Sequence, residues 1–167
     1  MILGPMSDHR VATIRQVKET DHKALTLFLR DNDTRETVRH FHPFPLTAET
    51  ATEIACTARS DRFYVATLNG RLVGLSMLRG WDQGFDVPSF GVIVDRSHRG
   101  LGLGRRMTEF AIEEAGRLKC RRIRLSVYAS NTRAVRLYES LSFRAVHREP
   151  SIVAGEADEK IVMVRDL

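Results

Sequence analysis

The stretch that decides the fold is VIVDRSHRGLGLGRRM, residues 92–107. It opens inside the apolar run Ser89 to Val94, which we expect to be a strand in the middle of a sheet. It closes in a helix, because apolar residues recur there at helical spacing: Leu103, Met107, Phe110, Ala111, Ala115 and Leu118. Three glycines, Gly100, Gly102 and Gly104, lie between the two elements.

The glycine-rich loop predicts an anion-binding site. Glycine lets the backbone come close to a ligand, and the unpaired N–H groups and positive dipole end of a helix favour phosphate. The spacing lacks the Lys-Ser/Thr ending of a P-loop and is not GxGxxG, so neither of these nucleotide-binding motifs applies. The alternative is that the glycines serve only a tight turn. Arginines concentrated between Arg96 and Arg106 favour the anionic ligand.

The rest of the chain alternates strand and helix patterns. Asn69-Gly70 supplies the positive φ angles of a tight hairpin turn. Asp21 is expected to cap the first helix, and the second begins at Thr50, or alternatively at Thr47. We expect strands at residues 10–17, 63–68, 72–78, 89–94, 122–128, 143–153 and 160–164, with a helix after each of residues 21, 50, 102 and 131.

The bulk properties favour one globular domain. We assign residues 10–167 to it and expect residues 1–9 to be disordered, with Met6 as an alternative start. The apolar fraction of 43% is ordinary, and no apolar run reaches the about 20 residues that cross a membrane. Cys56 and Cys120 lack CxxC spacing, so we expect neither a disulfide nor a metal site, and a cytoplasmic location.

The net charge of +5 is spread along the chain rather than gathered in a basic arm. We therefore expect a small anionic ligand as the partner and neither nucleic acid nor a membrane. The sequence does not fix the oligomeric state, and a homodimer is compatible with it.

A second motif identifies a family resemblance. The segment NTRAVRLYESLSF, residues 131–143, is similar to N-x-x-A-x-x-L-Y-E-x-x-G-F, and Arg99, Gly102 and Gly104 match Q/R-x-x-G-x-G/A. From Val92 onward the chain resembles the GNAT N-acetyltransferase superfamily. Ser142 replaces the usual glycine at a helix C-terminus, which affects the local turn more than the chemistry. Tyr138, taken alone, is also compatible with a core tyrosine on an apolar helix face.

The resemblance implies an α/β fold, with a largely antiparallel sheet of six or seven strands and helices on both faces. It also implies that acetyl-CoA, the acetyl donor, enters where strands 89–94 and 122–128 splay apart. By the resemblance, the backbones of Val92, Ile93 and Val94 would contact the pantetheine, and Asn131 would hydrogen-bond the cofactor. The pyrophosphate would be bound by the loop Arg99, Gly100, Leu101, Gly102, Leu103, Gly104 and Arg105. The amide of Ile93 or Val94 would polarise the thioester carbonyl, and Tyr138 would protonate the departing thiolate.

The resemblance says less about the acceptor. We expect a primary amine on a small molecule, such as an amino sugar; a protein N-terminus, a lysine, or a non-catalytic CoA-binding role are the alternatives. Ser126 stands where the similar ribosomal-protein alanine acetyltransferases carry a glutamate, so the general base is left among Asp82, Asp86 and water. His40 and His42 lack the partners of a metal site, but their loop, with Phe41 and Phe44, is a candidate wall of the acceptor pocket.

Overall fold

The computed structural model describes residues 11–167. The predicted disordered segment 1–9 and the alternative start Met6 lie outside the described residues. The strands are β1 (Thr13–Gln16), β2 (Arg62–Leu68), β3 (Arg71–Arg79), β4 (Ser89–Val94), β5 (Arg122–Tyr128), β6 (Arg144–Val153) and β7 (Glu156–Asp166). The helices are α1 (His22–Asn32), α2 (Arg35–His40), α3 (Ala48–Thr52), α4 (Leu103–Arg117) and α5 (Thr132–Ser140).

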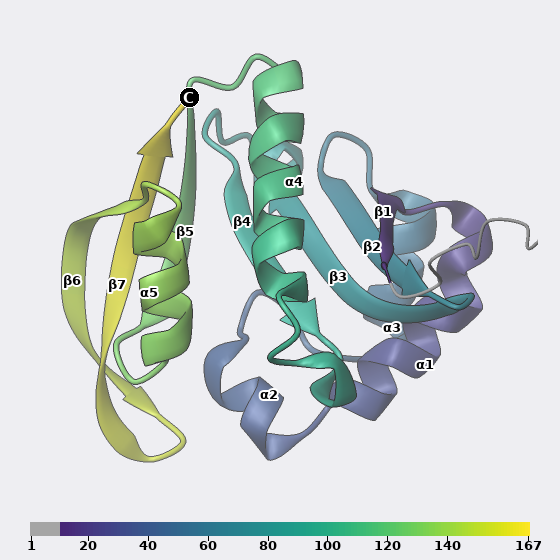
Figure 1. The fold of residues 1–167 in the computed structure, drawn as a ribbon, viewed down its shortest axis with the longest axis horizontal. Coiled ribbons are helices and arrows are strands. Elements are labelled where there is room, and N and C mark those ends of the chain that lie inside the picture. The colour runs from purple at the N-terminus through teal and green to yellow at the C-terminus, as the bar shows by residue number, and fades with distance from the viewer. Residues whose placement is uncertain (1–10) are drawn as a thin grey trace, which may run out of the picture.

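The seven strands form one mixed sheet in the order β1-β2-β3-β4-β5-β7-β6. Neighbouring strands are antiparallel except for the central pair β4 and β5, which is parallel. Helices α4 and α5 cover one face, and α1 and α3 lie behind the other (Figure 1). The predicted α/β fold, with its sheet of six or seven strands and helices on both faces, is confirmed.

Two tight turns join antiparallel neighbours. Asn69 and Gly70 have φ angles of 50° and 74°, which confirms the predicted hairpin between β2 and β3. Ala154 and Gly155, at 52° and 81°, make the same kind of turn between β6 and β7. Strand β7 begins at Glu156, four residues before the predicted start, because pairing with β6 runs up to the turn.

Helix α1 begins directly after Asp21, as predicted, but the predicted side-chain cap is not formed. The carboxylate of Asp21 makes no cap to α1; it accepts two hydrogen bonds from Arg15, both 2.8 Å, and one from the Lys18 amide, also 2.8 Å. The cap of α3 is Thr47, whose hydroxyl accepts the Thr50 amide at 3.3 Å. The alternative start is therefore the correct one.

Helix α2 was not predicted from the sequence. It is a single polar segment, RETVRH, too short to show an apolar stripe. Thr34 caps it by accepting the amide of Thr37 at 3.3 Å. This helix matters because it forms one wall of the cleft described below.

Helix α4 packs on strand β3 through Met107 and Gly74. A Cβ added to Gly74 would lie 2.5 Å from the sulfur of Met107, so a larger residue there would force the buried methionine to move. Met107, Ala111 and Ala115 are fully buried on the same helix face. The close contact fixes the first turn of α4 beside the end of β4.

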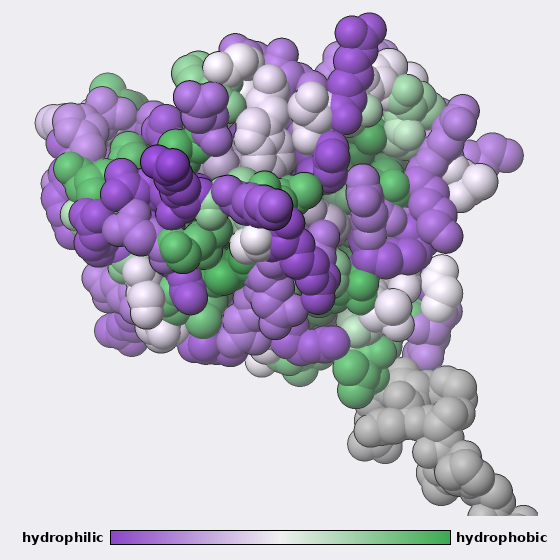
Figure 2. Space-filling model, turned by 90° about the horizontal axis from the view of Figure 1, so that it is seen from above, coloured by the Kyte–Doolittle hydropathy of each residue, from purple (hydrophilic) through white to green (hydrophobic). Residues whose placement is uncertain are grey.

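The surface seen from above is mainly hydrophilic, and hydrophobic side chains show only in small areas between polar ones (Figure 2). Among residues 11–167, no helix is long and apolar enough to span a membrane.

Candidate active site

Strands β4 and β5 pair at one end and then part. Their only paired residues are Ser89 and Arg124, and the Arg124 amide donates to the Pro88 carbonyl at 3.0 Å. Beyond this point β5 keeps only its pairing with β7, which runs along its other edge from Arg122 to Tyr128. A cleft of about 840 Å³ opens at the parting, between β4, β5, the first turns of α5, and α2 with the loop that follows it.

The backbone of β4 presents alternate residues to this gap. The Pro88 carbonyl points to β5 and the Asp95 amide bonds to β3, at 2.9 Å from the Val73 carbonyl. Because backbone groups of successive strand residues face opposite edges, the amides of Val92 and Val94 face the gap and that of Ile93 faces β3. Of the three residues predicted to contact pantetheine through their backbones, Ile93 is thus wrongly oriented.

The glycine-rich loop leaves its amides unpaired. Gly100 and Gly102 have φ angles of 80° and 79°, a conformation that L-residues rarely adopt, and Gly102 immediately precedes α4. No amide from Gly100 to Arg105 donates a hydrogen bond to any of the described residues. The Arg133 guanidinium lies over Gly100, 3.3 Å from where a Cβ would stand. Unpaired amides before a helix and an adjacent guanidinium are what an anion site requires, so the loop remains the predicted anion site.

The two arginines at the ends of this loop contact the protein itself. Arg99 donates to the Thr37 hydroxyl at 2.8 Å and pairs with Glu36 at 2.9 Å, which ties α2 to the end of β4. Arg105 donates to the Ser140 hydroxyl at 2.7 Å. Of residues 99–105, Arg99 alone lines the cleft, and the others continue from its end.

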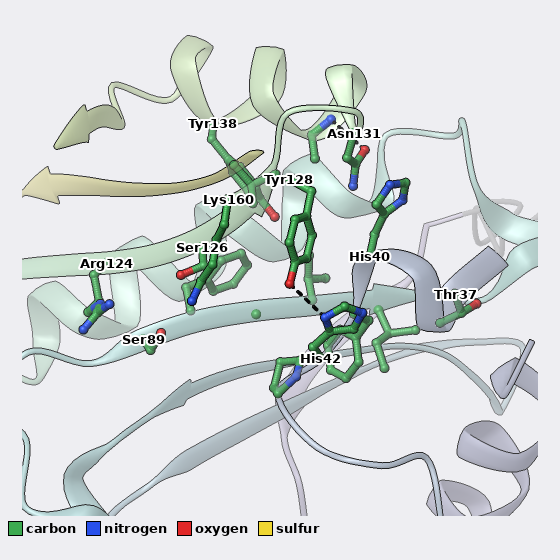
Figure 3. Close-up of a pocket in the computed structure, with 18 of the residues that line it drawn as sticks. Thr37, His40, His42, Ser89, Arg124, Ser126, Tyr128, Asn131, Tyr138 and Lys160 are labelled. Carbon is green, nitrogen blue, oxygen red and sulfur yellow. Dashed lines mark hydrogen bonds between the residues drawn. The ribbon is translucent and has the colours of Figure 1, made fainter. Parts of the chain in front are cut away.

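Tyr138 reaches the cleft from α5. Its ring is 8% exposed and packs edge-on against Phe90 and Phe143, with ring centroids 6.3 and 5.8 Å apart. Burial raises the pKa of Tyr138 to about 12, so its hydroxyl is protonated at neutral pH. The hydroxyl points into the cleft and bonds to none of the described residues (Figure 3).

Asn131 caps helix α5 and also lines the cleft. Its side-chain oxygen caps α5 by accepting the Ala134 amide at 3.3 Å. The amide nitrogen of the side chain forms no bond within the described residues, and Asn131 lines the cleft.

A tyrosine–histidine pair lies next to Tyr138: Tyr128 comes from β5, and His42 comes from the loop after α2 (Figure 3). His42 Nε2 is 2.7 Å from the Val38 carbonyl, which can only accept, so Nε2 carries the proton. In the neutral ring, His42 Nδ1 then accepts from the Tyr128 hydroxyl, 2.9 Å away. The oxygen of Tyr128 keeps its own acceptor capacity toward the cleft.

A second set of hydrogen bonds, which joins His40, Ser130 and Asp158, lies beside this pair. The Ser130 hydroxyl donates to Asp158 at 2.5 Å and accepts from His40 Nε2 at 3.0 Å. Burial, reinforced by nearby Arg39, lowers the pKa of His40. His40 is therefore neutral at physiological pH.

Neither acidic candidate for the general base lies in the cleft. Asp82 accepts the amides of Arg59 and Ser60, at 3.1 and 2.8 Å, and so stabilises a turn. Asp86 lines a separate cavity of about 500 Å³. The loop predicted to form a wall of the acceptor pocket lies only partly in the cleft. His40, Phe41 and His42 line the cleft, whereas Phe44 packs against Phe41 and Phe63.

Sequence reasoning missed several residues that line the cleft, among them Tyr128, Ser130, Arg124 and Lys160. Arg124, Ser126 and Tyr128 alternate with the buried Ile123, Leu125 and Val127, so the period of β5 could have placed them on one face. Lys160 had no such signal, because β7 joins β5 only through the tertiary pairing. Among the described residues there is no group of three or more side chains able to hold a metal ion.

Comparisons with known proteins agree with this geometry. The "Acetyltransferase (GNAT) family" model matches residues 24–143. A GCN5-related N-acetyltransferase from Kribbella flavida has 27% identity and a TM-score of 0.78, over 94% of this chain and 98% of that one. A putative acetyltransferase from Salmonella typhimurium, with its cofactor acetyl-CoA, has 22% identity and a TM-score of 0.77, over 95% of each chain.

A curated relative, the probable spermine N(1)-acetyltransferase of Bacillus subtilis subsp. natto, is 38% identical over 52 residues, 30% of this chain. The chain thus spans about a third of the length of that relative, 34%. The family model, in contrast, covers well over half of the chain and includes both motifs. The chain belongs to the GNAT acetyltransferase family.

Proposed function

We propose that the enzyme acetylates the primary amine of a small molecule by direct attack on acetyl-CoA. The observation that carries the proposal is the cleft between the parted strands, into which the protonated hydroxyl of Tyr138 points without a partner among residues 11–167. The matched relatives named as spermine acetyltransferases support a small amine as acceptor, although they align over only a third of their length.

The cleft and loop fit acetyl-CoA, whose thioester supplies the acetyl group. Val92 and Val94 offer backbone hydrogen bonds along the gap, where a pantetheine chain would extend β4. The unpaired amides of Gly100 to Arg105 and the Arg133 guanidinium suit its pyrophosphate. Asn131 would donate its side-chain amide, and Ile93 is left out because its amide faces β3.

Tyr138 would act on the sulfur. With a pKa of about 12 it remains protonated, and a thiol has a reference pKa of about 8.5. The tyrosine therefore stabilises a developing thiolate as a hydrogen-bond donor, and full proton transfer requires its pKa to fall in the complex.

Tyr128 and His42 would receive the proton of the amine. The Tyr128 oxygen can accept a hydrogen bond from the amine while its own proton moves to His42 Nδ1. The net change is one N–C bond formed, one S–C bond broken, and one proton passed from nitrogen to the enzyme. Here a histidine takes the place of the acidic base that the sequence did not supply.

The decisive experiment is a thiol-release assay with acetyl-CoA and a panel of amines: amino sugars, amino acids, polyamines and peptides. Tyr138→Phe should lower kcat by about 100-fold, the low end for general acid catalysis. Tyr64→Phe is the matched control, since Tyr64 is also buried, also has its pKa raised to about 12, and lies outside the cleft. Full kcat in Tyr138→Phe, with chemistry rate-limiting, would refute the assigned role.

The proton route has its own test. His42→Gln and Tyr128→Phe should each lower kcat by about tenfold or more and change the pH profile of kcat/KM in the same way. His22→Gln, which removes a histidine bonded to Thr52 outside the cleft, is the control. Different pH profiles for the two variants would show that they do not act as one relay.

A further inference from the structure

We infer that the acceptor carries an anionic group, a carboxylate or a phosphate, which Arg124 and Lys160 bind in the part of the cleft next to Tyr128. The inference rests on the proposed function and names the substrate class of the same site.

The cleft is strongly cationic. Among the described residues that line it, the cations are Arg39, Arg79, Arg99, Arg124, Arg133 and Lys160, and the one carboxylate is Glu36. Glu36 is already paired with Arg99 at 2.9 Å. Arg99 and Arg133 stand at the glycine-loop end, so four cations remain on the acceptor side. Cofactor phosphates therefore do not account for this charge.

Two of the four are held by other parts of the protein. Arg39 pairs with Glu156 at 2.8 Å, and Arg79 donates to the Pro43 carbonyl at 2.7 Å while lying over the Phe44 ring. Both still add positive potential to the cleft.

The other two are free enough to bind a ligand. Arg124 has no hydrogen bond or ion pair from its side chain to any of residues 11–167. Lys160 lies 3.3 Å from Glu149, but both side chains are well exposed, and an exposed pair of this kind is weak. An anion in the cleft can compete for the ammonium group.

The sheet register brings these groups together. Arg124, Ser126 and Tyr128 share one face of β5, and Lys160 stands opposite Tyr128 on β7. Figure 3 shows Arg124, Ser126 and Lys160 beside one another, with the Tyr128–His42 pair adjacent to them. Residues two apart on a strand lie about 6.6 Å apart, so a small molecule can place its amine at Tyr128 and its anion near Ser126.

The same charges disfavour a polyamine. A molecule such as spermine would bring several positive charges to a wall of four cations with no unpaired carboxylate among the described lining residues. The specificity in the names of the matched relatives is therefore not expected here, despite 38% identity over 52 residues.

The test measures kcat/KM in the thiol-release assay for matched amines. One arm compares amino acids with their amides, and a second compares glucosamine 6-phosphate with glucosamine, which separates carboxylate from phosphate. Spermine is the polycationic arm. We expect the anionic member of at least one pair to exceed its neutral partner by about tenfold, and spermine to be the poorest acceptor. The amides have the less basic amine, so a preference for the amino acid cannot come from easier deprotonation.

Single-residue variants test whether Arg124 and Lys160 cause the preference for anionic acceptors. Arg124→Gln and Lys160→Gln should each reduce the ratio of anionic to neutral kcat/KM by about tenfold, with KM for acetyl-CoA unchanged. Arg122→Gln is the matched control: it lies on the same strand and face but pairs with Asp166 away from the cleft. A preference for neutral or polycationic amines, or an unchanged ratio in both variants, would overturn this inference and leave the proposed function standing. Binding of acetyl-CoA with no turnover on any amine would overturn both.

Discussion

Replacing Ser142 with glycine should stabilise the protein. Ser142 has a φ angle of 65°, in the left-handed region, and follows Leu141, the C-cap of α5. The Phe143 amide bonds back to the Tyr138 carbonyl at 3.0 Å, and the Ser142 amide to Glu139 at 3.0 Å, so the turn holds the residues around the cleft tyrosine. The conformation is fixed by these contacts although serine does not favour it.

The magnitude follows from two opposing effects. The left-handed conformation costs an L-residue roughly 1–2 kcal/mol, and glycine removes this cost. Glycine also loses more backbone entropy on folding, by roughly 0.5–1 kcal/mol, so the net gain in the free energy of unfolding is about 0.5–1 kcal/mol. With an unfolding entropy of about 2.1 cal/mol/K per residue over 167 residues, Tm rises by about 1.5 to 3 °C.

Thermal unfolding followed by circular dichroism, together with urea denaturation, measures the effect. Ser142→Ala is the matched control, because it removes the same hydroxyl and keeps the left-handed strain, so it should bring no gain. The reasoning is refuted if Ser142→Gly fails to raise the urea midpoint, or if Ser142→Ala raises it equally.

Three further predictions follow from other parts of the fold. Gly102→Ala places a Cβ on a residue with a φ of 79°, so it should lower the free energy of unfolding by about 1–2 kcal/mol and raise the Kd for acetyl-CoA in calorimetry; an unchanged Kd would contradict the anion site. Asp61→Ala removes a buried acceptor of the Gly80 amide at 2.8 Å and should cost about 1–3 kcal/mol in urea denaturation, whereas Asp31→Ala on the surface should cost little. The hydrogen bonds from Arg15 lower the pKa of Asp21, so this carboxylate stabilises the fold above its unfolded pKa of about 4, and the stability is lost as pH falls through the lower folded value; Asp21→Asn should therefore lose less stability between pH 6 and pH 3 than the parent protein.

Local chemistry explains which elements could be predicted. The Asn69-Gly70 turn and the apolar period of α4 depend on neighbours within a few residues, and both appear as expected. Helix α2 could not be predicted, because its sequence RETVRH has no apolar stripe. The cap of α3 was left open between Thr47 and Thr50, because both are suitable cap residues. The early start of β7 reflects pairing with β6, which no local pattern encodes.

The family motifs predicted the donor half of the proposed site, because a glycine loop before a helix and a tyrosine on the next helix are short-range patterns. The proposed acceptor half could be drawn only from the tertiary structure. Asp82 and Asp86 were candidates for the general base because they precede β4 in the sequence. In the structure Asp82 stabilises a turn by accepting the Ser60 amide, and Asp86 lines another cavity. Three distant segments supply the residues of this half: β5 supplies Arg124 and Tyr128, the loop after α2 supplies His42, and β7 supplies Lys160. They meet because β4 and β5 part and α2 lies beside the gap. Convergence of that kind is a property of long-range packing, which residue spacing along the chain does not carry.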